Sequence, residues 1–555
     1  MKKSICILGI AIGLVLFEWG LVLAQEGTPT GESKIELQEV SIIGEDKSAL
    51  EGEEEEVIMK SVPQGEPPAY TMEKVEPPKI EPEPILPKVE GGAKTSLEEE
   101  KLPKPTLYSF GIAYGSDEVL LYDFTHTNET KEVGYYFRID RSRSDGFTFN
   151  NISPFQKFSQ DYISGDTITN FEKWSLRTEI AYLNKDLTLP YQQYGFVENK
   201  LKKAVSLSYE VKVQPESRLS LGLDIGKGDI HSSNWTANNN ALGVHLGFYT
   251  PFKKGNPPLS IGTKVYQEKL ECSGSLTLTG PDRTLKFYSL YVEGKRFKVG
   301  PDVLLDAKVS LDDYKNGFSS SQIDFLLKLH YSMKENLILL GSVERNLSLP
   351  AFDNLYIDND YSGINSKVEP EKSWKYKISG DYRSSDELFL EGAIFRQQIQ
   401  KYIFLEGGSA TSYTYRPNNI GKATFSGLEF GIRYYFNPNL SQNISYSYTK
   451  ASNKSGGVIP NVPKSRLKMG LKYKDGEELT INLNTEYADS TYASPDENAP
   501  KLNSYFLVNI TGEKRINENL FYSFSCENLL GEEYQYLLGY PGQKRRFAIG
   551  VRLRF

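Results

Sequence analysis

The 555-residue sequence has few of the side chains that usually carry catalysis or bind metals. It has three cysteines, of which Cys272 and Cys526 lie far apart and Cys6 lies in an apolar N-terminal stretch, so a disulfide framework and a Cys-x-x-Cys site are excluded. The sequence has no glycine-rich phosphate loop, nucleophile elbow or zinc-binding helix motif. The four histidines stand singly, without the spacing of metal ligands: His126, His231, His245 and His330. We therefore predict that the chain is not an enzyme and has no catalytic residue, cofactor, metal site or nucleic-acid partner.

Long apolar runs are also scarce. The clearest run, Ile5 to Phe17, follows two lysines and precedes Val22-Leu23-Ala24, whose small residues suit cleavage before Gln25. The run is short for a spanning helix, which needs about 20 residues, although a membrane anchor is the alternative. We predict a signal peptide for export over residues 1–24. Any later membrane insertion must then use β-strands.

Residues 25–104 are poor in aromatic side chains and rich in acid and proline. From residue 25 to residue 105 the chain has 20 acidic and nine basic residues, a balance of −11, and ten prolines lie between residues 63 and 105. Such a composition cannot bury enough apolar surface to offset the entropy lost on ordering. We predict a disordered periplasmic tail, partly in polyproline II conformation. The alternative is an unstructured tether with no partner.

Residues 105–555 show a different pattern, clearest in the last strand. One face of this strand is apolar, and the other is polar or small, with Arg546, Ala548, Gly550, Arg552 and Arg554. Such a strand requires hydrocarbon on one side and water on the other, as in the wall of a transmembrane β-barrel. The apolar face, which we also predict to be a signal for barrel assembly, consists of Phe547, Ile549, Val551, Leu553 and Phe555.

Similar alternation recurs along this region, in hairpins predicted at 205–225, 326–343 and 428–448. Short turns alternate with long connections, predicted at 144–169, 346–367 and 452–463, which is typical of outer-membrane barrels. We predict an all-β fold, a transmembrane antiparallel β-barrel of about 22 strands. A soluble β-sandwich is the alternative, but it explains neither the export signal nor the terminal phenylalanine.

The alternation also assigns side chains to the lumen and to the membrane interfaces. Arg433, Arg546, Arg552 and Arg554 are predicted to face the lumen, where they could attract an anionic solute or the acidic tail. We favour the simpler interpretation that they pair with interior carboxylates. Aromatic residues near strand ends are predicted to form girdles at lipid headgroup level: Tyr108, Tyr135, Tyr136, Tyr434, Tyr435, Phe521 and Tyr522.

Several segments of this region resemble the barrel of TonB-dependent outer-membrane receptors. Three motifs occur in the order found in that family: Val368-Glu369-Pro370-Glu371-Lys372-Ser373, then Asn419-Ile420-Gly421-Lys422-Ala423, then Glu527 to Tyr534. Residues 35–44 are similar to the TonB box of the family. The resemblance implies that Glu39, Val40, Ser41, Ile42 and Ile43 bind the energy-transducing protein TonB by adding a strand to its sheet.

The resemblance implies further partners: the outer-membrane barrel assembly machinery, outer-membrane lipid and an unknown solute. The sequence departs from the family at the plug. Between the TonB-box-like segment and the barrel lie only about sixty residues, without the hydrophobic periodicity of a fold. A barrel of this size normally encloses a plugged lumen. Inward loops, the tail or a separate plug or accessory protein could fill it.

We therefore predict a TonB-dependent receptor-like barrel of the bacterial outer membrane that takes up or transports a solute. A pull on the tail would open the lumen. Two alternatives stay open: a passive pore without a plug, and a non-conducting barrel that serves as an assembly or interaction protein.

Overall fold

The computed structural model describes residues 107–555, apart from residues 130–132, 150–151, 156, 172–173, 189–198, 214–216, 232–234, 252–257, 275–282, 316–318, 335, 349, 351–367, 410–411, 477 and 495–499. The predicted signal peptide, the tail and the TonB-box-like segment lie outside the described residues. Among the described residues, no helix has the length and apolar character needed to cross a membrane.

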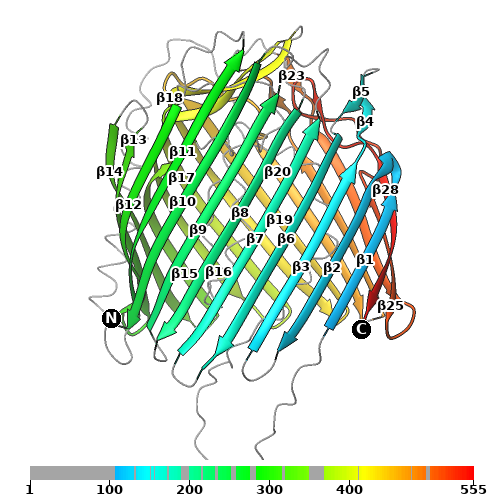
Figure 1. Ribbon diagram of the computed structural model, residues 1–555, viewed down its shortest axis with the longest axis horizontal. Helices are drawn as coiled ribbons and strands as arrows, with labels where there is room; N and C mark the ends of the chain where they lie inside the picture. The colour runs from blue at the N-terminus through cyan, green and yellow to red at the C-terminus, as the bar shows by residue number, and fades with distance from the viewer. Residues whose placement is uncertain are drawn as a thin grey trace, which may run out of the picture.

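A single antiparallel sheet of 22 strands closes on itself to form a barrel, as predicted (Figure 1). The first half of the wall consists of β1 (Leu107–Gly115), β2 (Leu120–Glu129), β3 (Val133–Ser144), β6 (Lys157–Asn170), β7 (Trp174–Thr188), β8 (Asn199–Val213), β9 (Ser217–His231), β10 (Trp235–Pro251), β11 (Pro258–Gly274), β12 (Arg283–Gly300) and β13 (Val303–Lys315).

The second half consists of β14 (Ser319–Lys334), β15 (Leu337–Ser348), β16 (Glu371–Arg383), β17 (Leu388–Ser409), β18 (Ser412–Asn437), β19 (Leu440–Asn453), β20 (Ser465–Asp475), β21 (Leu479–Ala488), β24 (Tyr505–Arg515), β25 (Leu520–Glu527) and β28 (Arg546–Arg554). The connections contain a short 3-10 helix, η2 (Ser116–Glu118), and six short strands: β4 (Phe147–Phe149), β5 (Ile152–Phe155), β22 (Thr491–Tyr492), β23 (Lys501–Leu502), β26 (Gln535–Leu537) and β27 (Tyr540–Pro541).

The barrel closes where β1 pairs with β28. Their register runs from Ser109 opposite Arg554 to Gly115 opposite Ala548. At the rim the backbone of Tyr108 and that of Phe555 exchange two hydrogen bonds, 3.0 and 2.9 Å long. Closure satisfies the backbone groups of both edge strands, which hydrocarbon requires.

Side-chain alternation assigns one face of the wall to lipid and the other to the lumen. In β28, Ile549 is 73% exposed, whereas the neighbouring Ala548 is buried. The same holds around the barrel, where exposed apolar residues such as Leu221, Leu290 and Ile394 occupy the outward face. A continuous apolar exterior around a closed sheet defines an integral membrane protein.

Short turns lie at the rim that carries the C-terminus, and longer connections lie at the opposite rim (Figure 1). The predicted hairpins are confirmed as β8–β9, β14–β15 and β18–β19. The predicted connection 144–169 is wrong at its far end, because β6 occupies residues 157–170. The outward positions of β6 include Ser159, Asp161 and Thr167, so the apolar alternation that marks other strands is weak here.

The predicted aromatic girdles are correct only in part. Tyr108 and Tyr522 are exposed on the outer face, but Phe521 is buried on the lumen side beneath Arg554, whose guanidinium lies 4.2 Å from the ring centroid. Adjacent residues of a strand point to opposite faces. Phe521 and Tyr522 therefore cannot belong to the same girdle.

Placing a charge on the lipid face tests this orientation. Val309, the central residue of β13, is 50% exposed on the outer face. We expect Val309→Arg to destabilise the folded barrel by about 2–4 kcal/mol, because the guanidinium would lie near the bilayer midplane. The measurement is urea unfolding in lipid vesicles. The control is Leu304→Arg on the same strand, since Leu304 faces the lumen opposite His330. An equal loss in both variants would contradict the assigned faces.

Candidate functional site

The lumen wall beside the closure carries a network of charged side chains. Arg552, only 3% exposed, lies 3.1 Å from the carboxylate of Asp123 on β2 and 3.8 Å from that of Glu513 on β24. Arg554 pairs with the other carboxylate oxygen of Glu513 at 2.8 Å. Buried charges need such partners, because an isolated ion in a low-dielectric site is costly. The network therefore connects the last strand to strands on both sides of the closure.

The other two arginines predicted to face the lumen are also paired. Arg546 lies 2.7 Å from Glu527 of the adjacent strand, and Arg433 lies 3.7 Å from Glu391. The interpretation that these arginines pair with interior carboxylates is thus confirmed for all four. The wall at these positions is balanced in charge rather than electropositive.

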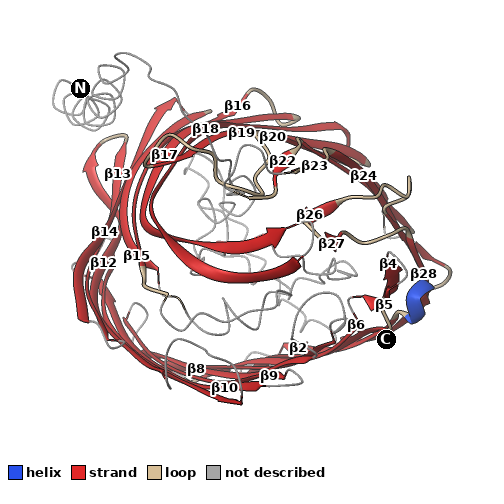
Figure 2. Cartoon of the chain, turned by 90° about the horizontal axis from the view of Figure 1, so that it is seen from above, coloured by secondary structure: helices blue, strands red, loops and turns tan. Residues whose placement is uncertain are grey.

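The lumen mouth at the rim opposite the C-terminus is crossed by a β-ribbon (Figure 2). Strands β17 and β18 have 22 and 26 residues, far more than the 9–11 that cross a bilayer. Figure 2 shows the two strands leaving the wall and arching over the interior. Lys401 has a φ of 56°, a backbone conformation that L-residues rarely adopt, where the ribbon projects beyond the wall. We call residues 399–425 the mouth ribbon.

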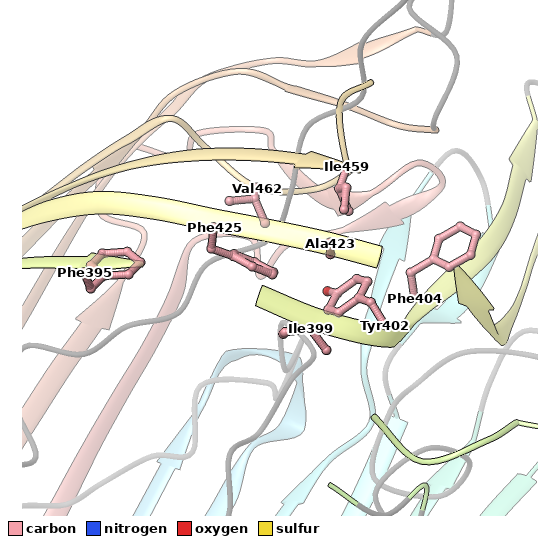
Figure 3. Packing of buried hydrophobic residues seen from close by; sticks show 8 residues of the cluster. All are labelled: Phe395, Ile399, Tyr402, Phe404, Ala423, Phe425, Ile459 and Val462. Carbon is pink, nitrogen blue, oxygen red and sulfur yellow. The ribbon is translucent and has the colours of Figure 1, made fainter. Parts of the chain in front are cut away.

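Apolar packing holds the base of the mouth ribbon against the neighbouring connection. Phe395, Ile399 and Tyr402 of β17 pack with Ala423 and Phe425 of β18 (Figure 3). Ile459 and Val462, from the β19–β20 connection, complete the cluster. All of these side chains are buried, and a buried aliphatic or aromatic side chain stabilises a fold by about 1.5–3 kcal/mol. The ribbon therefore has an apolar core of its own.

A hydrogen-bonded clamp fixes the ribbon to the segment that precedes β16. The side chain of Asn419 accepts a 2.7 Å hydrogen bond from the Glu369 N–H and donates one of 3.0 Å to the Glu369 carbonyl. Its amide also donates to the Lys401 carbonyl at 2.6 Å, and Lys401 forms an ion pair with Glu369. The Glu371 carboxylate accepts a 2.6 Å bond from the Ile403 N–H. Two of the motifs recognised in the sequence thus meet in space.

The third motif forms a second clamp in the connection after β25. Asn528, with a φ of 47°, donates from its side chain to the carbonyls of Glu532 and Gln543 at 2.8 and 2.9 Å. Its side-chain oxygen accepts a 2.8 Å bond from the Glu532 N–H, and its backbone N–H donates to Asn509 at 2.8 Å. One buried side chain therefore organises a connection of 18 residues.

Tyrosines pack beneath this connection. Tyr534 contacts Tyr505 and Tyr536, with ring centroids 4.8 and 5.1 Å apart, and the Tyr505 hydroxyl donates to Glu486 at 3.0 Å. Burial raises the pKa of Tyr534 well above its ordinary value of 10, so the hydroxyl stays protonated at neutral pH. Gly542 lies against the Tyr534 ring so closely that a Cβ would fall 2.0 Å from it. These contacts hold the connection; they are structural rather than catalytic.

The structure pairs the four predicted lumen arginines with carboxylates. Two other groups of predicted site residues are not tested by it. Residues Glu39–Ile43, predicted to bind TonB, lie outside the described residues. The predicted barrel-assembly signal lies on the outward side of the last strand and of the residue that follows it, with Phe547, Ile549, Val551, Leu553 and Phe555. Its role in barrel assembly stays a prediction. The described residues contain no group of three or more side chains arranged to hold a metal ion. The mouth ribbon and its clamp were not predicted, although the length of the strand-like sequence on either side of residues 406–411 could have indicated a long hairpin.

A closed barrel with an apolar exterior, a charged lumen and inward connections at one rim defines a large outer-membrane β-barrel. Comparison with known proteins gives the family: residues 103–529 match the TonB dependent receptor-like, beta-barrel family. The chain therefore belongs to the β-barrel family of TonB-dependent receptors. This is a family of outer-membrane transporters rather than enzymes.

The curated relatives are distant. The vitamin B12 transporter BtuB of Photobacterium profundum is 24% identical over 259 residues, which cover 46% of this chain and 41% of that protein. The probable TonB-dependent siderophore receptor PiuA of Acinetobacter baumannii is 23% identical over 431 residues, covering 72% and 56%. The chain thus spans about half the length of the curated relatives it matches.

Solved structures agree on the fold. The FrpB iron transporter of Neisseria meningitidis superposes with a TM-score of 0.64 over 81% of this chain and 82% of that chain, at 13% identity. At such an identity the likeness establishes the barrel fold and nothing about the solute.

The clamp can be tested by removing one side chain. We expect Asn419→Ala to loosen the mouth ribbon by about 1–3 kcal/mol, because it removes three hydrogen bonds and leaves their backbone partners unsatisfied. The measurement is hydrogen exchange of residues 399–425 by mass spectrometry in detergent. Asn240→Ala, at an exposed position on β10, is the matched control. Unchanged exchange in the Asn419 variant would refute the clamp.

Proposed function

We propose that this protein takes up a solute across the outer membrane as a TonB-dependent receptor. The observation that supports the proposal most directly is the mouth ribbon on a barrel of this family. An apolar cluster and the Asn419 clamp both hold it across the lumen. A permanently open pore has no need of such a cover. Gated passage therefore accounts for the structure better than a passive pore does.

The proposed energy input is a pull on the N-terminal tail. Val40, Ile42 and Ile43 of this segment are apolar and β-branched, which suits addition as a strand to an edge of a TonB sheet. Between this segment and β1 lie about sixty residues rich in proline and acid. A chain of that length can span about 190 Å when extended as polyproline II, so a pull at its far end can reach the barrel.

The solute is proposed only as a class. The relatives are named for vitamin B12, siderophores and iron. We propose a small solute of this range, captured at the rim that carries the mouth ribbon. The paired charges on the lumen wall do not select among these solutes, because Arg433, Arg546, Arg552 and Arg554 are each engaged by a carboxylate.

Conductance in planar bilayers tests gating. We expect the full-length barrel to conduct little, and a chain lacking residues 25–104 to conduct more if the tail blocks the lumen. Adding Asn419→Ala to the truncated chain should raise the conductance further, because it releases the mouth ribbon. A large and constant conductance in the full-length protein would overturn gated uptake and support a passive pore. Silence in every variant would favour a lumen filled by inward loops or by a separate plug, or an interaction barrel.

Crosslinking tests the TonB contact independently. We expect Ser41→Cys to form an adduct with TonB carrying a cysteine in its C-terminal domain, because Ser41 lies within the proposed added strand. Ser48→Cys, seven residues further along the same tail, is the control and should crosslink far less. Equal yields at both positions would mean that the contact is not specific to residues 39–43.

A further inference from the structure

The outward face of strands β15–β19 carries a row of cations near the rim with the mouth ribbon. Arg345 on β15, Arg396 on β17, Lys422 on β18 and Lys450 on β19 all lie on this face. Their side is set by parity along each strand, since Ile394, Leu428 and Tyr448 on the same strands are exposed to the outside. We call these four side chains the outer cationic patch.

Pairing between strands places the four cations close together. Arg396 lies opposite Ser426, which lies opposite Lys450 on the next strand. Arg345 lies opposite Trp374, and Trp374 lies opposite Gln398, two residues from Arg396. Neighbouring strands are about 4.8 Å apart and residues two apart are separated by about 6.8 Å. Lys422 lies opposite Gln400, four residues along from Arg396, so the patch extends over strands β15–β19 and suits two adjacent anionic groups rather than one.

The neighbouring positions show that the patch lies just outside the apolar band. Trp374 stacks on Tyr376, and the Arg345 guanidinium lies 5.6 Å from the Trp374 ring centroid. Such rings favour the level of lipid headgroups. Around them the outward positions change from aliphatic to hydrogen-bonding residues: Gln398, Gln400, Thr424, Ser426 and Ser452. Cations are tolerated here, whereas the bilayer centre would penalise them by about 2–4 kcal/mol each.

Several outward cations elsewhere on the wall have carboxylate partners on the same face, although Lys203 and Lys286 form no ion pair with a described residue. Arg141 lies 3.2 Å from Asp161, Lys227 lies 3.3 Å from Asp229, and Lys315 lies 3.3 Å from Asp313. The described outward positions around the patch contain no aspartate or glutamate.

The two carboxylates just before and at the start of β16 are engaged elsewhere. Glu369 pairs with Lys401, and Glu371 accepts from Ile403. The Arg396 Nε–H group is buried and has no acceptor among the described residues. The patch therefore has positive charge, and in Arg396 a hydrogen-bond donor, for which the described residues supply no acceptor.

We propose that the outer cationic patch binds the phosphate groups of a phosphorylated glycolipid headgroup in the outer leaflet. Arginine and lysine bind phosphate through charge-assisted hydrogen bonds, and the adjacent amides and hydroxyls suit the sugar that carries the phosphates. The partner is a membrane lipid because the patch faces away from the lumen and borders the apolar band. The proposal rests on the membrane location and not on solute uptake.

Binding of lipopolysaccharide, the phosphorylated glycolipid of bacterial outer leaflets, tests the proposal on the full-length protein in detergent. We compare two fourfold variants by native mass spectrometry. The patch variant is Arg345→Gln, Arg396→Gln, Lys422→Gln and Lys450→Gln. The control variant loses the same number of outward cations, all with carboxylate partners: Arg141→Gln, Lys227→Gln, Lys269→Gln and Lys315→Gln.

We expect the patch variant to bind at least about tenfold more weakly and the control to stay within about threefold of the parent. Dephosphorylated lipopolysaccharide should bind the parent as weakly as the intact lipid binds the patch variant. Equal losses in both variants, or equal binding of the dephosphorylated lipid, would overturn the proposal. Displacement of the lipid by millimolar inorganic phosphate would assign the patch to free anions instead of a lipid. If the fourfold variant does not fold, lipopolysaccharide binding is measured on the single variants Arg396→Gln and Lys450→Gln instead.

Discussion

The structure depends on the requirement that every backbone N–H and C=O within hydrocarbon find a partner in the protein. A sheet can meet this requirement only by closing, and here closure joins residues 109–115 to residues 548–554. The charged network of Arg552, Asp123 and Glu513 lies on the lumen side of the same junction. Backbone pairing on the wall and ion pairing in the lumen therefore stabilise the same junction between the two ends of the barrel.

The connections at the mouth depend on a different kind of interaction. There, the side-chain amide of an asparagine forms hydrogen bonds with main-chain N–H and C=O groups that have no partner in a neighbouring strand. Asn419 and Asn528 each donate and accept hydrogen bonds with main-chain groups of a remote or irregular segment. An asparagine can do both at once, whereas an aspartate or a serine offers a different set of donors and acceptors. This explains why short motifs, far apart in sequence, carry the family resemblance: they are the points at which irregular backbone is satisfied.

The sequence predicts the barrel well because the alternation of apolar and polar residues is a local property of each strand. The count of about 22 strands agrees with the structure, as does the pairing of β8 with β9 and of β18 with β19. Strand β6 was missed because its outward positions include polar residues, and Phe521 was assigned to the wrong face because an aromatic residue alone does not report direction. The length of the strand-like sequence could have indicated a projection beyond the wall, but it does not show that β17 and β18 bend over the lumen as a cover. Pairing of the lumen arginines was predicted, but their partners were not, because these lie on other strands.

The outer cationic patch occupies only one sector of the wall, strands β15–β19. Several outward cations in other sectors, such as Arg141, Lys227 and Lys315, are each neutralised by a carboxylate on the same face. Seen from above the membrane, the barrel thus has a front and a back, although its outline is nearly round (Figure 2). Neighbouring molecules that drift in the plane of the bilayer meet different surfaces on different sides. The charge of the outer wall therefore differs from one sector to another, and four side chains rather than the shape of the barrel set this difference.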